Sequence, residues 1–198
     1  MNSLVLLDRD GTINVDNHYV ISFEQVELIE GSAKAISLLN GAGLELLVVS
    51  NQSAIARGYG TVEDVRNVNS LVLKMIQEQI LEKIEMEFVF CPHKSEDSCC
   101  CRKPMTGMIG NNLIKIPQLK NYFNEDSKIK DASNVWMIGD KLSDVEFGLN
   151  LGIKEKNCIL VRTGKGKATE KELPNEFLQK ITVFDNLLEA SKHIVLVS

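Results

Sequence analysis

Short runs of apolar residues recur along the chain and alternate with segments whose apolar positions lie three or four residues apart. Each run is typical of a buried strand, and we expect strands at Leu4–Leu7, Leu44–Val49, Phe88–Phe90, Val135–Ile138 and Ile159–Val161, with a weaker one at Ile181–Phe184. Helical spacing is found at Ala33, Ile36 and Leu39, and from Val65 to Ile80 after a candidate capping residue, Thr61. The alternation predicts a Rossmann-like α/β sandwich of three layers, with helices covering both faces of a central parallel sheet.

Three of the predicted strands end in polar residues that can carry chemistry. Asp8 and Asp10 follow the first strand, Ser50 to Ser53 follow the second, and Gly139 to Lys141 follow the run that ends at Ile138. Ligands of parallel sheets bind beyond the carboxyl ends of the strands, so we expect these groups to meet at one rim. Each ending alone has a simpler explanation, because acids with glycine form ordinary turns and Ser-Asn is a common helix cap. All three at one rim favour a functional site.

Two carboxylates two positions apart on an extended chain repel each other, and the repulsion is relieved by a cation. Asp8 and Asp140 can share one Mg²⁺ with the backbone carbonyl of Asp10, because Mg²⁺ prefers oxygen ligands and a substrate phosphate completes its shell. A metal keeps Asp8 ionised as a nucleophile that forms an aspartyl-phosphate. Asp10 then protonates the departing alcohol and later accepts a proton from water.

A transferring phosphoryl group also needs hydrogen-bond donors and a positive charge around it. Ser50 and Asn51 can supply the donors, and Lys103 can supply the charge, although a solvated surface lysine is the commoner arrangement. Asp144 follows Asp140 by four residues. It can support the metal ligand from the first turn of a helix, and an exposed helix acid is the alternative.

Size and charge restrict the class of protein. The 198 residues suit one domain, residues 1–198, and the net charge of −5, from 22 basic and 27 acidic residues, comes without a long basic run. We therefore expect no nucleic-acid partner. No apolar run approaches the roughly 18 residues that cross a bilayer, and no signal-like segment opens the chain. A monomer in the cytoplasm, with no membrane partner and a small-molecule substrate, is the expectation.

The cysteines are clustered rather than spread along the chain. Four of the five cysteines lie within a short segment that also holds a histidine: Cys91, His93, Cys99, Cys100 and Cys101. Clustering of this kind predicts a closed, structural Zn²⁺ site in a loop at about residues 91–104, rather than a disulfide framework. We expect Cys91, His93, Cys99 and Cys101 as ligands, with Cys100 as an alternative to its neighbour. Cys158 lies in an apolar run and is expected in the core.

Four motifs together resemble those of the haloacid dehalogenase phosphatase superfamily: Asp8-Arg9-Asp10-Gly11-Thr12, Ser50-Asn51-Gln52, Arg102-Lys103-Pro104 and Gly139-Asp140-Lys141-Leu142-Ser143-Asp144. Longer strings resemble the narrower family of D-glycero-D-manno-heptose-1,7-bisphosphate 7-phosphatases: Ile13-Asn14-Val15-Asp16, Ile55-Ala56-Arg57-Gly58, Cys91-Pro92-His93 and Val161-Arg162-Thr163-Gly164-Lys165. The resemblance covers nearly the whole chain and weakens after about Lys167 and through Asn121 to Asp131. The stretch from Asn121 to Asp131 is itself polar enough to be a surface loop.

The resemblance implies roles for individual residues. Asp8 is the nucleophile and Asp10 the general acid/base, Mg²⁺ binds Asp8, Asp10 and Asp140, and Ser50 and Lys103 stabilise the phosphoryl group. Implied substrate contacts are Asp16, Asn17, His18, Tyr19, Ser50, Asn51, Gln52, Ser53, Arg102, Lys103 and Lys141. It also implies a minimal cap over the site. Ala54 stands where the family usually has glycine, and Cys100 adds a thiol to the zinc loop.

The implied reaction is removal of the C7 phosphate of the heptose bisphosphate, in the supply of nucleotide-activated heptose for lipopolysaccharide. Histidinol-phosphate phosphatases resemble the chain through the same acids and the same zinc loop, and are the nearest alternative. A zinc-stabilised binding module that has lost catalysis is an alternative of a different class. It fits less well, because a binding protein gains nothing from retaining two repelling acids beside Asp140.

Overall fold

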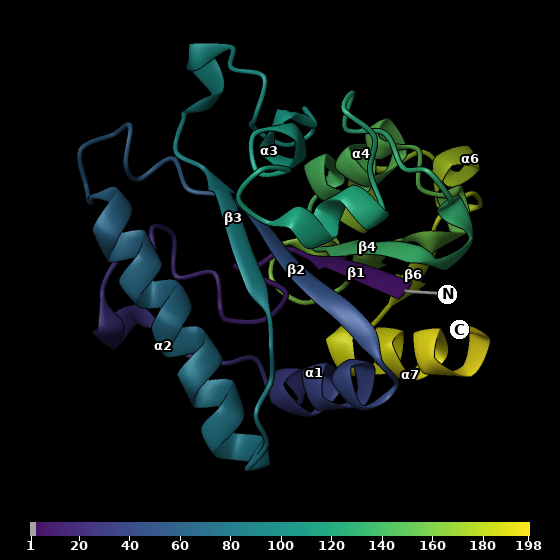
Figure 1. Ribbon diagram of the computed structural model, residues 1–198, viewed down its shortest axis with the longest axis horizontal. Helices are drawn as coiled ribbons and strands as arrows, with labels where there is room; N and C mark the ends of the chain where they lie inside the picture. The colour runs from purple at the N-terminus through teal and green to yellow at the C-terminus, as the bar shows by residue number, and fades with distance from the viewer. Residues whose placement is uncertain (1–2) are drawn as a thin grey trace.

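The computed structural model describes residues 3–198, in which six parallel strands form one sheet in the order β3-β2-β1-β4-β5-β6 (Figure 1). The strands are β1 (Ser3–Leu7), β2 (Leu44–Asn51), β3 (Glu87–Cys91), β4 (Val135–Gly139), β5 (Cys158–Val161) and β6 (Thr182–Phe184). The helices are α1 (Ser32–Gly41), α2 (Val62–Ile80), α3 (Gly107–Gly110), α4 (Leu142–Leu151), α5 (Gly166–Glu172), α6 (Asn175–Leu178) and α7 (Leu187–Val197). The predicted α/β sandwich with a central parallel sheet is confirmed.

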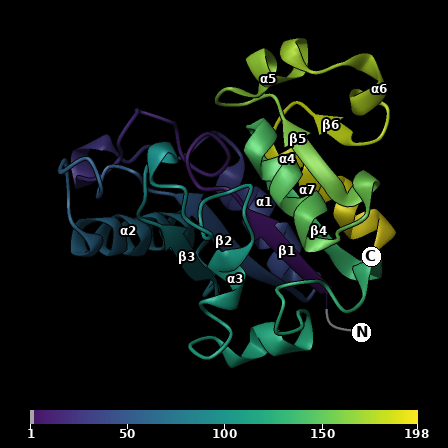
Figure 2. The same ribbon diagram turned by 90° about the horizontal axis from the view of Figure 1, so that it is seen from above.

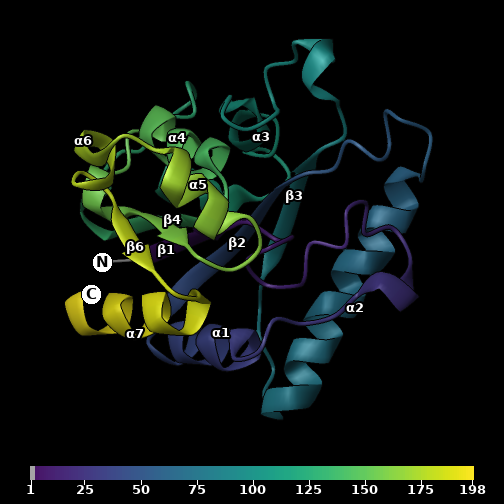
Figure 3. The same ribbon diagram turned by 180° about the vertical axis from the view of Figure 1, so that it is seen from behind.

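Helices cover the two faces of the sheet and make two separate cores (Figures 1 and 3). Side chains alternate between the faces along each strand, so Val5 and Leu7 of β1 pack on the side of α1, α2 and α7. Leu4 and Leu6 pack on the opposite side, which α3 and α4 cover. Because both faces of β1 are buried, its sequence is a continuous apolar run rather than an alternating one.

The predicted strands and helices correspond closely to the observed ones. All six predicted strands are present, and α1 and α2 occupy the segments with helical spacing. Thr61 caps α2 as predicted, since its side chain accepts a hydrogen bond from the backbone N–H of Asp64. Cys158 is fully buried in β5, as expected. Among residues 3–198 there is no helix with the length and apolar character needed to cross a membrane.

The segment from residue 121 to residue 131, predicted as a polar surface loop, is only partly exposed. Tyr122 and Phe123 lie in the core beside α3 and α4, with exposed fractions of 5% and 1%. Two aromatic side chains outweigh the polar residues around them, because each buries a large apolar area. The surface-loop prediction is therefore wrong for the start of this segment.

The register of the three central strands brings their carboxyl ends together. Leu7 of β1 pairs with Val48 of β2 on one side and with Ile138 of β4 on the other. The backbone N–H of Asp8 donates to the carbonyl oxygen of Ile138 at 2.9 Å, which extends this pairing one residue past β1. Figure 2 shows the sheet from above, with the connections after β1, β4 and β5 on the same side. The residues that follow these strands therefore share one rim.

Candidate active site

Three carboxylates meet at the rim, and two of them, Asp8 and Asp140, come from the predicted strand ends. One carboxylate oxygen from each of Asp8, Asp140 and Asp144 lies within 4.8 Å of the other two, and all three residues are buried. Asp8 follows β1, Asp140 follows β4, and Asp144 lies in the first turn of α4. The alternative that Asp144 is an exposed helix acid is wrong, because its exposed fraction is 1%.

Lys103 supplies positive charge to this acidic cluster. Its Nζ donates to Asp8 Oδ1 at 2.7 Å and lies 2.7 Å from Asp144 Oδ1. The side chain is only 2% exposed, so a solvated surface lysine is excluded. Burial lowers the pKa of Lys103, but the charges of Asp144 and Asp8 outweigh it and the pKa is raised. Lys103 is therefore a buried cation bound to the predicted nucleophile.

The backbone around Lys103 is fixed by the predicted site residue Asn51. The backbone N–H of Lys103 donates to Asn51 Oδ1 at 3.0 Å, and Asn51 Nδ2 donates to the carbonyl oxygen of Lys103 at 3.1 Å. Arg102 Nη1 donates to the backbone carbonyl oxygen of His93 at 2.9 Å, which ties the same segment to the cysteine loop. In this structure the Asn51 amide thus positions the lysine.

The charges at the rim shift the pKa values of the two principal acids in opposite directions. Burial raises the pKa of Asp8, but Lys103 and Lys141 more than compensate, so its pKa lies below the usual value. Burial, followed by the charge of Asp8, raises the pKa of Asp140 to about 7. The Asp8 carboxylate is consequently favoured in its ionised form, whereas ionisation of Asp140 becomes easier when a further cation lies beside it.

The rim fits a divalent cation that prefers oxygen ligands. Asp140 Oδ1 is buried without a hydrogen-bond partner among the described residues. The ammonium group of Lys141 lies 3.6 Å from this oxygen, 4.0 Å from Asp8 Oδ2 and 3.4 Å from the carbonyl oxygen of Asp10. These are the three residues predicted to hold Mg²⁺. All of these donors are oxygen atoms, and they already face a positive charge. The donor set therefore suits Mg²⁺.

The loop after β5 was not predicted as part of the site, although it fixes Asp140. The backbone N–H of Lys165 donates to Asp140 Oδ2 at 2.7 Å. A Cβ at Gly11 or at Gly164 would lie 2.3 Å from the same oxygen, so only glycine fits at either position. The signal was available, because this loop also follows a predicted strand. It was missed because the contacts are made by backbone atoms.

Asp10 is held by several donors at the edge of the acidic cluster. Gln52 Nε2 donates to Asp10 Oδ2 at 2.8 Å, and Asn14 Nδ2 donates to Asp10 Oδ1 at 2.9 Å. The neighbouring Arg9 also pairs with this carboxylate. Gln52 Nε2 reaches the buried Ser50 Oγ as well, at 3.2 Å. Gln52, predicted to contact substrate, therefore links Ser50 with Asp10 in this structure.

The remaining predicted substrate residues lie farther along two loops. Asp16 joins the rim, with its Oδ2 3.3 Å from Lys141 Nζ. Asn17 and His18 are exposed, and Asn17 Nδ2 donates to the carbonyl oxygen of Gln25. The ring of Tyr19 lies 5.0 Å from that of Tyr59, centroid to centroid, which connects this loop with the loop that begins at Ser53. These four residues are outside the acidic cluster.

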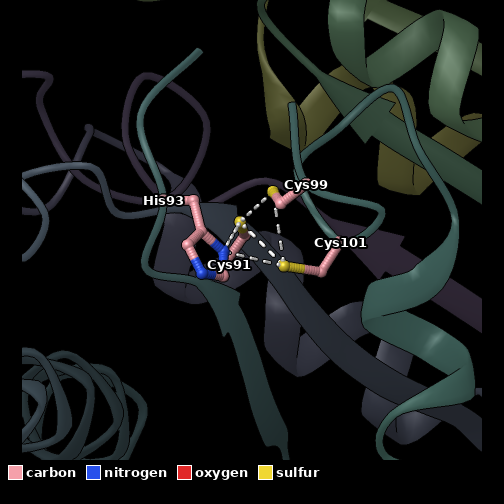
Figure 4. A group of neighbouring side chains, drawn as sticks. All are labelled: Cys91, His93, Cys99 and Cys101. Carbon is pink, nitrogen blue, oxygen red and sulfur yellow. Dashed lines mark hydrogen bonds between the residues drawn. The ribbon is translucent and has the colours of Figure 1, made fainter. Parts of the chain in front are cut away.

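The cysteine loop forms a second cluster (Figure 4). One ligand atom from each of Cys91, His93, Cys99 and Cys101 lies within 4.8 Å of the others. His93 Nδ1 lies 3.5 Å from Cys91 Sγ and 3.3 Å from Cys101 Sγ. All of these cysteines are free thiols, and Cys100 is exposed outside the group. Three sulfurs and one nitrogen converging on one point suit tetrahedral Zn²⁺.

The thiols of this cluster differ in acidity. Burial raises the pKa of Cys91 and of Cys101. Burial opposes ionisation of Cys99 too, but hydrogen bonds from the backbone N–H of Cys101 and from Cys91 lower its pKa to about 7. Cys99 is the thiol that ionises most easily, and a metal is needed to hold the other two as thiolates.

Comparison with known proteins relates this geometry to characterised enzymes. Residues 100–190 match the family described as HAD-hydrolase-like. The chain is 35% identical over 193 residues to D-glycero-beta-D-manno-heptose-1,7-bisphosphate 7-phosphatase of Neisseria meningitidis serogroup A, covering 97% of this chain and 94% of that protein. It is 34% identical to the protein of the same name from Pseudomonas putida, covering 97% and 99%. The crystal structure of D,D-heptose 1.7-bisphosphate phosphatase from B. bronchiseptica, complexed with magnesium and phosphate, superposes with a TM-score of 0.79 at 26% identity, covering 99% of each chain.

Proposed function

The chain belongs to the family of D-glycero-beta-D-manno-heptose-1,7-bisphosphate 7-phosphatases, and from this premise we propose that it removes the C7 phosphate of the heptose bisphosphate through an aspartyl-phosphate on Asp8. The observation that carries the proposal is the buried contact of 2.7 Å between Lys103 Nζ and Asp8 Oδ1, beside Asp140 and Asp144. A buried lysine lowers the cost of ionising the nucleophile and offers charge to an incoming phosphoryl group.

In the first step, the free oxygen of Asp8 attacks phosphorus while Lys103 and Ser50 stabilise charge on the phosphoryl oxygens. Asp10 gives its proton to the departing C7 alcohol. In the second step, Asp10 takes a proton from water, which attacks the phosphorus of the aspartyl-phosphate and releases inorganic phosphate. Asp8 regains its carboxylate, and protons and charges balance over the cycle.

Two metals complete the proposal. Mg²⁺ would be held by Asp8, Asp140 and the carbonyl oxygen of Asp10, and when bound it neutralises charge on the phosphoryl oxygens. Asp144 supports this site by pairing with Lys103. Zn²⁺ would be held by Cys91, His93, Cys99 and Cys101. Four protein ligands would leave no position for water, so the metal would fix the segment that carries Arg102 and Lys103.

The second phosphate of a sugar bisphosphate distinguishes the proposed substrate from histidinol phosphate. Arg102 and Lys141 both lie beside the rim and can meet an additional anionic group. Asp16 and its neighbours Asn17, His18 and Tyr19 are proposed to contact the sugar. Histidinol phosphate has a single phosphate and a cationic amine, so it offers no second anionic group to these two cationic residues.

The surroundings of the enzyme are part of the proposal. We propose that residues 1–198 act as one catalytic domain with a minimal cap, as a monomer in the cytoplasm. A reducing compartment keeps the zinc-loop thiols available for metal. The mass of the purified protein in solution, measured by light scattering, tests the monomer.

The decisive test of substrate is phosphate release from both anomers of D-glycero-D-manno-heptose 1,7-bisphosphate and from histidinol phosphate. We expect kcat/KM for a heptose bisphosphate to exceed that for histidinol phosphate by about 30- to 150-fold, because one unpaired polar or charged contact costs roughly 2–3 kcal/mol. A preference for histidinol phosphate would replace the proposed substrate. No release from any of the three would favour the inactive binding module.

A further inference from the structure

Arg9, which lies between the two predicted catalytic acids in the sequence, is a fully buried cation with an exposed fraction of 0%. Its guanidinium pairs with Asp10 through two parallel bonds, from Nε to Oδ1 at 3.0 Å and from Nη2 to Oδ2 at 2.9 Å. Nη2 also donates to the carbonyl oxygen of Val20 at 3.2 Å. Nη1 donates to Asn69 Oδ1 at 2.8 Å. Each of the three nitrogens of the guanidinium therefore has a partner.

Asn69 is a buried polar residue of α2, and its hydrogen bond to Arg9 accounts for its position there. The buried residues of α2 are Val65, Val68, Asn69, Val72 and Ile76, so Asn69 is the single polar member of an otherwise apolar stripe. A buried amide on such a stripe costs stability unless it is hydrogen-bonded. Its bond to Arg9 connects residues 60 positions apart in the sequence.

The geometry fixes the orientation of the Asp10 carboxylate. A planar guanidinium that bonds both carboxylate oxygens sets the plane of the carboxylate as well as its distance. The other donors to Asp10 are the neutral amides of Asn14 and Gln52, one to each oxygen. With four donors, the acceptor positions of the carboxylate are filled. Charge-assisted bonds are the stronger pair, so an amide bond yields first, and the carboxylate oxygen that Asn14 or Gln52 then releases is the one that carries the proton for the departing alcohol.

We propose that Arg9 is a positioning residue that holds Asp10 in the orientation for proton transfer, and that Asn69 fixes Arg9 in turn. The inference rests on the proposed function, in which Asp10 protonates the departing alcohol. Through Asn69 and Arg9, α2 then helps to position Asp10, although α2 contributes no side chain to the acidic cluster. The competing explanation is that the Asp10–Arg9–Asn69 chain of hydrogen bonds only stabilises the fold.

The dependence of rate on the leaving group separates positioning from stability. An alkyl phosphate needs protonation of its poor leaving group, whereas p-nitrophenyl phosphate expels a stable phenolate and needs much less help from a general acid. The ratio of kcat/KM for the heptose bisphosphate to kcat/KM for p-nitrophenyl phosphate therefore reports on Asp10. This ratio refers to transfer of the phosphoryl group to Asp8, and damage common to both substrates cancels from it.

The variant to measure is Asn69→Leu, which removes the acceptor for Arg9 Nη1 and leaves the guanidinium of Arg9 intact. We expect the ratio to fall by about tenfold to a hundredfold, because a small misplacement of a catalytic group has effects of this size. The matched control is Asn67→Leu, the same change two residues away at an exposed position of α2. Asn69→Asp keeps an acceptor oxygen and should retain the ratio better than Asn69→Leu. Thermal unfolding of each variant verifies that it is folded.

Asp10→Asn separates failure of this inference from failure of the proposed function. If the ratio falls in Asp10→Asn and Asn69→Leu but not in Asn67→Leu, the positioning role stands. If it falls in Asp10→Asn alone, the acid role of Asp10 stands and the positioning role is refuted. If Asp10→Asn itself leaves the ratio unchanged, Asp10 is not the general acid, and the proposed mechanism fails with the inference. Should Asn69→Leu not fold, Arg9→Lys, which keeps the charge but cannot bond both oxygens in parallel, is measured in its place with the same expected fall.

Discussion

The acidic rim and the zinc loop both gather ligand atoms around one point, but they are assembled by different means. At the rim, Asp8 and Lys103 are 95 positions apart and meet because the sheet register and a connecting loop bring them together. In the zinc loop, all ligand residues fall between Cys91 and Cys101. The rim therefore depends on the whole fold, whereas the loop brings its ligand atoms together locally and depends on a metal only under the proposed function.

The two regions also differ in how their buried ionisable groups are stabilised. The rim balances three buried acids against Lys103 and Lys141, so opposite charges compensate within the protein. The zinc loop offers thiols, which remain protonated and neutral until a cation displaces their protons. One connection between the regions is the segment in which Arg102 Nη1 donates to the carbonyl oxygen of His93 and the next residue is Lys103. A loss of charge at the rim should therefore lower stability and activity more than a loss of metal in the loop.

The largest effect is expected for Lys103→Met, which removes the cation and keeps the length of the side chain. Asp8 and Asp144 are left as buried acids without their partner, which costs roughly 3–5 kcal/mol of unfolding free energy. Activity should fall by about 10²- to 10³-fold, because a charge aimed at the phosphoryl group is lost. Urea unfolding and phosphate release measure the two effects. Stability equal to that of the wild type would contradict the buried ion pairs.

A smaller effect is expected for Cys101→Ser in the zinc loop. Loss of one thiolate should abolish stoichiometric zinc, measured by metal analysis, and lower the unfolding free energy by roughly 3 kcal/mol. Activity should fall only about tenfold, through less precise placement of Arg102 and Lys103. The matched control is Cys100→Ser, which changes an exposed thiol one residue away. Equal zinc loss in both variants would reassign the ligands to include Cys100.

The smallest effect is expected for Asp140→Asn, studied without Mg²⁺ and without a chelator that would remove zinc. The pKa of Asp140 is raised to about 7 by burial and by Asp8, above its usual value of 3.8. The unfolded chain then loses this proton before the folded protein does, so the wild type loses stability as pH rises from about 4 to about 7. Asparagine does not titrate, and this variant should be the more stable by on the order of 1–3 kcal/mol above pH 7.

Urea unfolding at several pH values measures this difference between wild type and Asp140→Asn. The stability advantage of the variant should shrink toward pH 4, and added Mg²⁺ should stabilise the wild type more than the variant. An advantage that does not change with pH would contradict the raised pKa. An equal response to Mg²⁺ would contradict the role of Asp140 in holding the metal.

The sequence predicted the fold and the principal acids well because the relevant patterns are local. Continuous apolar runs mark strands buried on both faces, and the rule for strand ends places Asp8, Ser50 and Asp140 at one rim. The sequence did not reveal Asn69, whose partner Arg9 is 60 positions away. It gave Lys165 no role in the site either, although the string that contains it was noted for its resemblance, because a backbone N–H makes the contact and every residue except proline has one.

For the polar stretch from Asn121 to Asp131, the sequence led to a prediction that is partly wrong, rather than to no prediction. Its average composition is that of a surface loop, although Tyr122 and Phe123 are buried. A window average hides two large apolar side chains, whereas packing depends on each of them. The proposed substrate residues Asn17 and His18 were predicted from family resemblance, and no charge pattern at the rim would have identified them.

The central claim is that the phosphoryl group passes to Asp8, and trapping this intermediate tests it most directly. Asp10→Asn slows hydrolysis of the aspartyl-phosphate, whereas p-nitrophenyl phosphate forms this intermediate with little help from a general acid, so acid quenching of this variant during reaction with p-nitrophenyl phosphate should preserve the intermediate. Mass spectrometry should then find one phosphoryl group on the peptide that contains Asp8, and none in the double variant that also carries Asp8→Asn. A phosphoryl group on another residue, or undiminished phosphate release by Asp8→Asn alone, would contradict the account.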